Sequence, residues 1–294
     1  MYLVVGANGF LGSYILKNIL EKTEDSVIAV ARHIERCAKN PRTEWVSCDI
    51  SKWNDVDALL KRVNQVSNLK VVFLAAYHNP DLVEKNQRKA WNINITSLSY
   101  FINGLDHVKC LFYPSTDSVY GESTDRYHFR EADTPHPVNT YGRQKMIAEM
   151  LVYGHGYNVV RYPFLIAPSL SPSKKHFYDQ IIQSLQKSEK VEMFADSLRS
   201  SLDFNTAASL LIEVIERYTE DIPKILNISG DDDLSKYDIG ILIADKLGAD
   251  RNLIVPTSVE SSKNIFEAAR AKSTLMDNSI LKEILGQTDV KISL

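Results

Sequence analysis

Cysteine is scarce in this chain, and charge of neither sign dominates. The three cysteines, Cys37, Cys48 and Cys110, are odd in number, widely spaced and without a CxxC pair, so neither a disulfide framework nor a metal site is indicated. Lysine plus arginine number 34 against 37 aspartate plus glutamate. No stretch gathers the positive charge into the basic stripe that a nucleic-acid-binding surface needs. We therefore expect reduced thiols and no nucleic-acid partner.

Long apolar runs are absent as well. The run at Val71–Ala76 is far shorter than the ~20 residues that span a bilayer, and Met1–Val5 carries neither a basic segment nor a long apolar one. We expect no membrane partner and a cytoplasmic location. The 294 residues, with 44% hydrophobic and 24% charged side chains, resemble an ordinary globular protein: one large domain, or a large domain with a smaller companion.

Short β-branched runs alternate with longer amphipathic segments over the first half of the chain. This alternation is typical of βαβ units, so the expected fold class is α/β, with a doubly wound parallel sheet of the Rossmann type. The predicted strands are Tyr2–Val5, Val27–Val30, Trp45–Cys48, Val71–Ala76, Cys110–Pro114 and Val159–Phe164. The predicted helices between them are Ser13–Glu21, Asn54–Val66, Lys89–Gly104 and Thr140–Tyr153.

The pattern changes after Phe164, where Pro168–Ser173 fits neither strand nor helix periodicity. We predict a dinucleotide-binding Rossmann domain at residues 1–165 and a smaller substrate-binding region at residues 166–294, of which about 201–222 packs back on the first domain. Helices are predicted here at Phe177–Lys187, Asn205–Tyr218, Lys236–Leu247 and Ser279–Leu285, with a strand at Ile225–Ile228.

A glycine-rich turn separates the first predicted strand from the first helix. In this architecture the turn is where a dinucleotide pyrophosphate meets a helix N-terminus. Gly6 permits the tight turn, Gly9 lets backbone N–H groups approach the phosphates, and Gly12 allows close packing of helix and strand. The alternative is a turn that binds nothing. The predicted cofactor contacts in this turn are Gly6, Asn8, Gly9, Phe10, Leu11 and Gly12.

The end of the second predicted strand indicates which dinucleotide binds. An acidic residue there hydrogen-bonds the ribose hydroxyls of NAD, but this chain has Arg32, followed one turn later by Arg36. A guanidinium can bind a ribose phosphate in a bidentate, charge-assisted manner. We therefore predict NADP, with NAD as the alternative if Arg32 is only a solvated loop residue.

Two further segments carry acid/base chemistry. Tyr141 and Lys145 are four residues apart, which places them on one face of a helix. A free phenol has a pKa of roughly 10, and a nearby ammonium favours its ionised form. Thr116 follows a predicted strand, at the sheet edge where ligands bind, and its hydroxyl can hydrogen-bond a substrate carbonyl. A surface Tyr–Lys pair and a self-bonded threonine turn are the respective alternatives.

The three segments, in this order, resemble the extended short-chain dehydrogenase/reductases: a GxxGxxG turn, a Ser/Thr strand end followed by Val-Tyr-Gly, and YxxxK. The resemblance runs over nearly the whole chain. It implies further cofactor contacts from Asp49 and Ile50 at the adenine, Ala75 and Ala76 at the ribose, and Tyr162 at the nicotinamide. It also implies that Lys145 contacts the cofactor, along with Tyr141.

Within that family, Ser115-Thr116-Asp117 and the segments 226–230 and 270–277 are similar to the dTDP-4-dehydrorhamnose reductases. This implies reduction of a 4-keto group on a nucleotide-linked sugar, with Tyr141 as general acid and Thr116 and Asp117 at the substrate. Arg199 is implied at the nucleotide diphosphate. Ser118 stands where dehydratases carry glutamate, and Phe10-Leu11 is more like the epimerases. The alternatives are an epimerase with retained cofactor and a non-catalytic dinucleotide-binding regulatory subunit; a homodimer is also implied.

Overall fold

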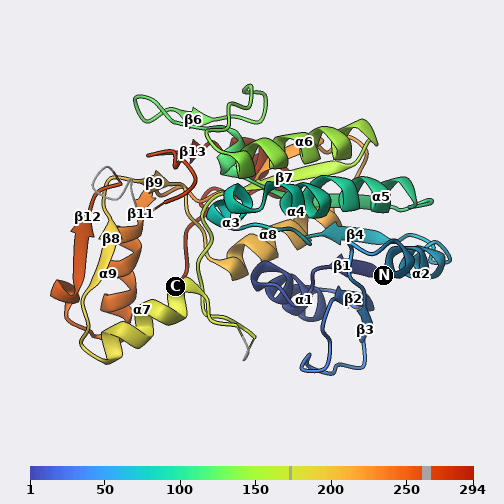
Figure 1. Ribbon diagram of the computed structural model, residues 1–294, viewed down its shortest axis with the longest axis horizontal. Helices are drawn as coiled ribbons and strands as arrows, with labels where there is room; N and C mark the ends of the chain where they lie inside the picture. The colour runs from blue at the N-terminus through green and yellow to red at the C-terminus, as the bar shows by residue number, and fades with distance from the viewer. Residues whose placement is uncertain (172–173, 260–265) are drawn as a thin grey trace.

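The computed structural model describes residues 1–171, 174–259 and 266–294, and Figure 1 shows its arrangement. A seven-stranded sheet in the order β10-β7-β5-β4-β1-β2-β3 forms the larger part. All its strand pairs are parallel, which confirms the predicted fold class. The strands are β1 Tyr2–Val5, β2 Val27–Ala31, β3 Thr43–Ser47, β4 Lys70–Phe73, β5 Cys110–Thr116, β7 Asn158–Tyr162 and β10 Ile225–Asn227.

Helices cover both faces of this sheet, which is why its central strands are apolar throughout. Successive side chains of a strand point to opposite faces: in β1, Tyr2 and Val4 belong to one core, whereas Leu3 and Val5 belong to the other. The first core is closed by α1 Phe10–Lys22, α8 Phe204–Glu216 and α10 Ser279–Leu285. The second is closed by α2 Trp53–Val63, α5 Ser97–Asn103 and α6 Thr140–Gly154.

A second region lies beside the sheet, on the left in Figure 1. We define it as α7 Phe177–Gln186, β8 Val191–Phe194, β9 Leu198–Arg199, β11 Leu234–Ser235, α9 Lys236–Leu247 and β12 Ile254–Thr257. Its separate core packs α7 and α9 against β8 and β12, which pair in parallel. The short strands β6 His128–Phe129 and β13 Leu275–Met276 pair with each other. Neither the second region nor β6 and β13 contributes a strand to the large sheet.

The predicted helix at 89–104 is interrupted in the structure. It consists of α4 Gln87–Trp91, a π-helical turn at Asn92–Thr96, and α5. Within the turn, Asn94 accepts a hydrogen bond from the Tyr77 backbone N–H at 2.7 Å and donates to Gln144 Oε1 at 2.9 Å. The turn therefore ties the loop after β4 to α6, a contact that periodicity alone does not reveal.

The other differences from the predicted elements involve few residues. The fourth predicted strand ends at Phe73, and a helix that was not predicted, α3 Pro80–Lys85, begins after it. The remaining predicted helices and sheet strands occur in place, with ends shifted by a few residues. Cys37, Cys48 and Cys110 are all free thiols, and no described helix is long and apolar enough to cross a membrane.

Candidate active site

A pocket of about 680 Å³ opens at the carboxyl ends of β1, β4, β5 and β7, between the sheet and the second region. Ligands bind at this edge in open α/β sheets. Most of the residues singled out in the sequence line it: Gly6, Gly9, Phe10, Leu11, Gly12, Ala76, Thr116, Asp117, Tyr141, Lys145, Tyr162 and Arg199. The others, Asn8, Arg32, Asp49, Ile50 and Ala75, are not among its lining residues.

The glycine turn has the geometry that a pyrophosphate needs. Gly6 has a φ of +93°, which favours glycine, and a Cβ on Gly12 would lie 2.3 Å from the Gly6 carbonyl oxygen. Gly9 is the N-cap of α1, and no side chain caps this helix end. Its first turn contains no acidic residue, so backbone N–H groups and the positive end of the helix dipole face the pocket. These residues fit a bound dinucleotide.

Two cations lie beyond the turn, where the adenine ribose is expected. Arg32 is exposed, and its charge helps to lower the pKa of Asp49, although burial alone would raise it and hydrogen bonds from Ser51 contribute more to the lowering. Lys174 Nζ donates to the Asn8 carbonyl oxygen at 2.7 Å, and burial, assisted by the Arg32 charge, lowers the Lys174 pKa. The sequence gives no signal for Lys174 because 166 residues separate it from Asn8.

Tyr141 and Lys145 lie together on α6, whose first turn is capped by Asn139 Oδ1 accepting from the Gly142 N–H at 2.8 Å. Burial and the nearby Asp117 carboxylate raise the Tyr141 pKa, and the Thr116 hydroxyl opposes this shift. Together these contributions favour the neutral phenol of Tyr141. The lowering of the tyrosine pKa by Lys145 together with a bound nicotinamide stays a prediction.

The contacts of Lys145 are with strand β5. Its Nζ donates to the Tyr113 hydroxyl and to the Pro114 carbonyl oxygen, each at 2.7 Å. Burial lowers the Lys145 pKa to about 7, although the Glu149 carboxylate favours the charged form. The Lys145 amine is thus held by β5. Tyr113 was not predicted as a site residue, since nothing in the local sequence distinguishes it from a core aromatic.

Thr116 ends β5 in a turn that uses its own hydroxyl. Thr116 Oγ1 accepts from the Ser118 N–H at 3.2 Å and donates to Asp117 Oδ1 at 2.9 Å. The self-bonded threonine turn, one of the two interpretations of this sequence, is thus present. Thr116 still lines the pocket, but its hydroxyl would have to turn away from Asp117 before it could donate to a substrate carbonyl.

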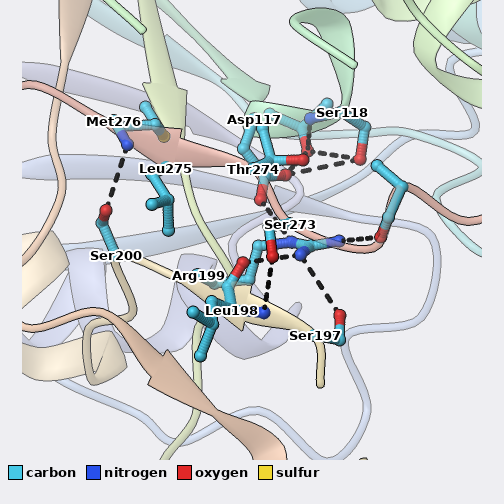
Figure 2. A network of polar contacts seen from close by, with 12 residues as sticks. Asp117, Ser118, Ser197, Leu198, Arg199, Ser200, Ser273, Thr274, Leu275 and Met276 are labelled. Atoms are coloured by element: carbon cyan, nitrogen blue, oxygen red, sulfur yellow. Dashed lines mark hydrogen bonds and ion pairs between the residues drawn. The ribbon is translucent and has the colours of Figure 1, made fainter. Parts of the chain in front are cut away.

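Arg199 joins this strand end to the second region, as Figure 2 shows. Its Nε lies 3.2 Å from Asp117 Oδ2, and Asp117 is buried. Burial raises the Asp117 pKa, and the Arg199 charge opposes that shift. The two remaining nitrogens donate to Ser197 Oγ and to three carbonyl oxygens, those of Leu198, Ala271 and Lys272. The contact of Arg199 with a nucleotide diphosphate stays a prediction, and it would require Arg199 to exchange these bonds.

A buried ion pair anchors the helix that carries Tyr141. Arg161 of β7 is 1% exposed and Glu149 of α6 is 4% exposed. Arg161 Nη2 lies 2.7 Å from Glu149 Oε2, and Arg161 Nε lies 3.2 Å from each carboxylate oxygen. Ser115 also donates to Glu149, and Arg161 Nη1 donates to the Tyr120 hydroxyl at 2.8 Å. The network fixes α6 against β5 and β7, directly behind Thr116.

Several pocket residues have no counterpart in the sequence predictions. They are His176, Phe177, Phe194, Phe204, Lys236, Phe266 and Arg270. His176 packs edge-on against Phe10, with ring centroids 4.7 Å apart, and burial lowers its pKa to about 4, so it is neutral at pH 7. These side chains come from helix starts, from the end of β8 and from loops in the second half of the chain, where a single sequence offers no periodic signal. Among the described residues, no cluster of histidine, cysteine and carboxylate side chains is placed to hold a metal ion.

Comparison with known proteins places this geometry in a family. The sequence model described as RmlD substrate binding domain matches residues 1–291. The chain belongs to the RmlD substrate-binding domain family. This family match confirms the resemblance to extended short-chain dehydrogenase/reductases. Structural neighbours include dTDP-4-dehydrorhamnose reductases and a sugar-nucleotide epimerase.

Sequence relatives of this RmlD-family chain differ in function. Methionine adenosyltransferase 2 subunit beta of Danio rerio is 25% identical over 260 residues, 86% of this chain and 76% of that protein. The probable low-salt glycan biosynthesis reductase Agl14 of Haloferax volcanii is 24% identical over 287 residues, 96% of this chain and 91% of that protein. Membership of the RmlD family therefore does not by itself decide whether this chain is an enzyme.

Solved structures show the same fold at low sequence identity. A dTDP-4-dehydrorhamnose reductase from Bacillus anthracis, in complex with NADP, has a TM-score of 0.77 at 20% identity and covers 98% of this chain and 93% of its own. The UDP-glucuronic acid 4-epimerase from Bacillus cereus, in complex with UDP-glucuronic acid and NAD, has a TM-score of 0.81 at 20% identity and covers 99% and 94%. Both cofactors and both reaction types thus occur on this fold.

Proposed function

We propose that this chain is an NADP-dependent reductase of a 4-keto sugar linked to a nucleotide, with Tyr141 as the general acid. The observation that carries the proposal is the neutral phenol of Tyr141, which is half-buried in the same pocket as the open N-terminus of α1. A proton donor and an anion-binding helix end are what a carbonyl reduction with a dinucleotide requires.

The residues assigned to the cofactor follow from the glycine turn in the pocket and, for those outside the pocket lining, from the family resemblance. The Gly9 N–H already donates to the Gly6 carbonyl oxygen at 3.0 Å, so the N–H groups of Phe10 and Leu11 at the start of α1 would hold the pyrophosphate. Arg32 with Lys174 would hold the ribose phosphate. Asp49, Ile50, Ala75 and Ala76 would border the adenosine, with Tyr162 and Lys145 nearer the reacting end. The bound nicotinamide supplies the hydride for reduction.

Proton transfer depends on residues that the chain itself provides. Because the Tyr141 pKa is raised, the phenol is protonated at neutral pH and can donate to the substrate oxygen as that oxygen becomes an alkoxide. Thr116 would turn its hydroxyl from Asp117 to the same oxygen and orient it. Asp117 remains fixed by Arg199, which keeps the strand end in place while the hydroxyl moves.

A second candidate function is a dinucleotide-binding regulatory subunit. Similarity to methionine adenosyltransferase 2 subunit beta favours it, whereas the convergence of Thr116, Tyr141 and Lys145 on one pocket favours catalysis. An epimerase with retained cofactor would use the same three side chains. A homodimer and a cytoplasmic location remain predictions.

The deciding experiment is incubation with a panel of nucleotide-linked 4-keto sugars and either NADPH or NADH, followed by loss of reduced-cofactor absorbance and by product analysis. The reductase proposal expects NADPH consumption and a 4-hydroxy product. Isomerised sugar without net cofactor consumption would indicate the epimerase instead. Cofactor binding without turnover on any sugar would favour the regulatory subunit.

Gly9→Val tests whether the glycine turn binds the cofactor. A side chain on Gly9 would occupy the approach to the pyrophosphate, so NADPH binding should be abolished. The fold should persist, because Gly9 has a φ of −73° and its Cβ would meet only the Gly6 oxygen at 3.2 Å; we expect a loss of about 1 kcal/mol in unfolding free energy.

The measurement is NADPH titration by fluorescence, with denaturant unfolding in parallel. Gly154→Val is the matched control, because a Cβ there has no atom within 4 Å. It should leave NADPH binding unchanged. Tight NADPH binding by Gly9→Val would show that the turn is purely structural.

Arg32→Asp tests the choice of NADP over NAD. It removes the guanidinium and puts a carboxylate beside a ribose phosphate, so the Kd for NADPH should rise about 10–100-fold. The Kd for NADH, which lacks that phosphate, should change little. Lys39→Asp makes the same change of charge farther along the exposed loop and controls for long-range electrostatics. An equal loss of affinity for both cofactors would count against the NADP assignment.

A further inference from the structure

Lys236 occupies an unusual position at the second-region end of the pocket. It is the first residue of α9 and follows the capping residue Ser235. Its Nζ lies 5.3, 5.5 and 5.6 Å from the ring centroids of Phe164, Phe177 and Phe194, and all four side chains line the pocket. Aromatic faces attract an ammonium ion, but they leave its three N–H donors without a strong acceptor.

The other two cations at this end of the pocket have carboxylate partners. Arg199 is paired with Asp117, and Arg270 Nη2 lies 2.7 Å from Asp81 Oδ2. Within residues 1–171, 174–259 and 266–294, the Lys236 side chain makes no hydrogen bond or ion pair. It is partly buried, and cations withdrawn from water are ordinarily paired, so Lys236 is an ammonium whose partner the described residues do not supply.

We infer that Lys236 binds an anionic oxygen of the substrate, either a phosphate oxygen or a carboxylate oxygen. The inference deepens the proposed function, and it rests on that function only in calling the ligand a substrate. The two neighbouring guanidinium groups favour an anion at the same place, and they disfavour a cationic or neutral apolar ligand. The three phenylalanines shield part of the contact from water, which strengthens it.

The protonation of Lys236 gives the contact a pH dependence. Burial and the charges of Arg199 and Arg270 lower the Lys236 pKa to about 8. Lys175 and His176 line the same pocket, and Asp238 of α9 is engaged by Ser235. Only the ammonium form attracts an anion strongly. Affinity should therefore be full below pH 7 and should fall as the pH rises through about 8, and binding near pH 8 should take up protons.

The test measures binding of two probe anions, inorganic pyrophosphate and glucuronate, to the full chain by isothermal titration calorimetry. Titrations run from pH 7 to pH 9.5, in buffers of different ionisation enthalpy, so that proton uptake is measured directly. The variants are Lys236→Met, which keeps the apolar stem, and Lys236→Arg, which stays charged over this range. Lys246→Met, at the exposed last turn of the same helix, is the matched control.

We expect at least one anion to bind the wild type, Lys236→Arg and Lys246→Met, and to lose about tenfold or more in affinity in Lys236→Met. Affinity should fall with pH in the wild type relative to Lys236→Arg. Binding of pyrophosphate alone identifies a phosphate ligand, and binding of glucuronate alone an acidic sugar. Equal affinity in wild type and Lys236→Met, or no binding of either anion, overturns the inference. Calorimetry needs no turnover, so this outcome is independent of the reductase assay.

Discussion

Replacing Tyr141 by phenylalanine should lower kcat about 10²–10⁴-fold, the usual value of general acid catalysis, and leave the Kd for NADPH nearly unchanged. The ring, with its packing on α6, is retained, and only the hydroxyl that protonates the alkoxide is lost. A residue that acts only in the transition state affects kcat and kcat/KM together. Steady-state kinetics on the sugar identified by the panel, with a parallel NADPH titration, measures both quantities.

Two comparisons sharpen this prediction. Tyr153→Phe makes the same change on the same helix, at a side chain that is 57% exposed, and should leave kcat unaltered. Thr116→Val should cost less than Tyr141→Phe, since it removes an orienting hydrogen bond but keeps the proton donor. Near-full turnover by Tyr141→Phe would mean that another group is the acid and that the proposed mechanism is wrong.

Glu149→Gln should lower the free energy of unfolding by about 3–5 kcal/mol, because it leaves the Arg161 guanidinium buried and uncompensated. The size of the glutamine side chain matches that of glutamate, so the effect reports charge and hydrogen bonding and not a cavity. This is a large share of the ~5–15 kcal/mol stability of a typical domain. Equilibrium unfolding in urea measures it without any assumption about function.

The double variant Glu149→Leu with Arg161→Met should recover most of that loss, since well-packed apolar residues often replace a buried ion pair at little cost. Asp245→Asn is the control: it breaks the exposed pair between Asp245 and Arg251 and should cost less than about 1 kcal/mol. If Glu149→Gln lost no more than this control, the buried network would contribute little to holding α6.

The parts of the site that were predictable are those in which local sequence dictates local structure. The glycine turn needs residues without a Cβ, because a Cβ on Gly12 would lie 2.3 Å from the Gly6 oxygen. The spacing of Tyr141 and Lys145 needs only a helix. Each of these two features involves residues that are close together in the sequence. The alternation of strands and helices around them determines at which edge of the sheet they meet.

The rest depends on contacts between segments that are far apart in the chain. Lys145 is held by Tyr113 of β5, and the Asn94 turn is held by Tyr77 and Gln144. The strands β8 and β12 are four residues each and only partly buried, so their periodicity is weak. The pairing of charges is equally non-local, because nothing in the sequence around Arg199 indicates that its carboxylate partner is Asp117.

The order of the elements restricts how the molecule can be divided. After β7 the chain enters the second region with α7, β8 and β9, and it returns to the large sheet with α8 and β10. It then enters the second region again with β11, α9 and β12, and it ends with α10 beside the sheet. A fragment ending at residue 165 would lack β10, exposing the edge of β7, and would leave α1 without α8. An unpaired strand edge beside bare apolar surface promotes aggregation. A protease that cuts one of these connections would leave the others intact, so the nicked protein should stay in one piece until it is denatured.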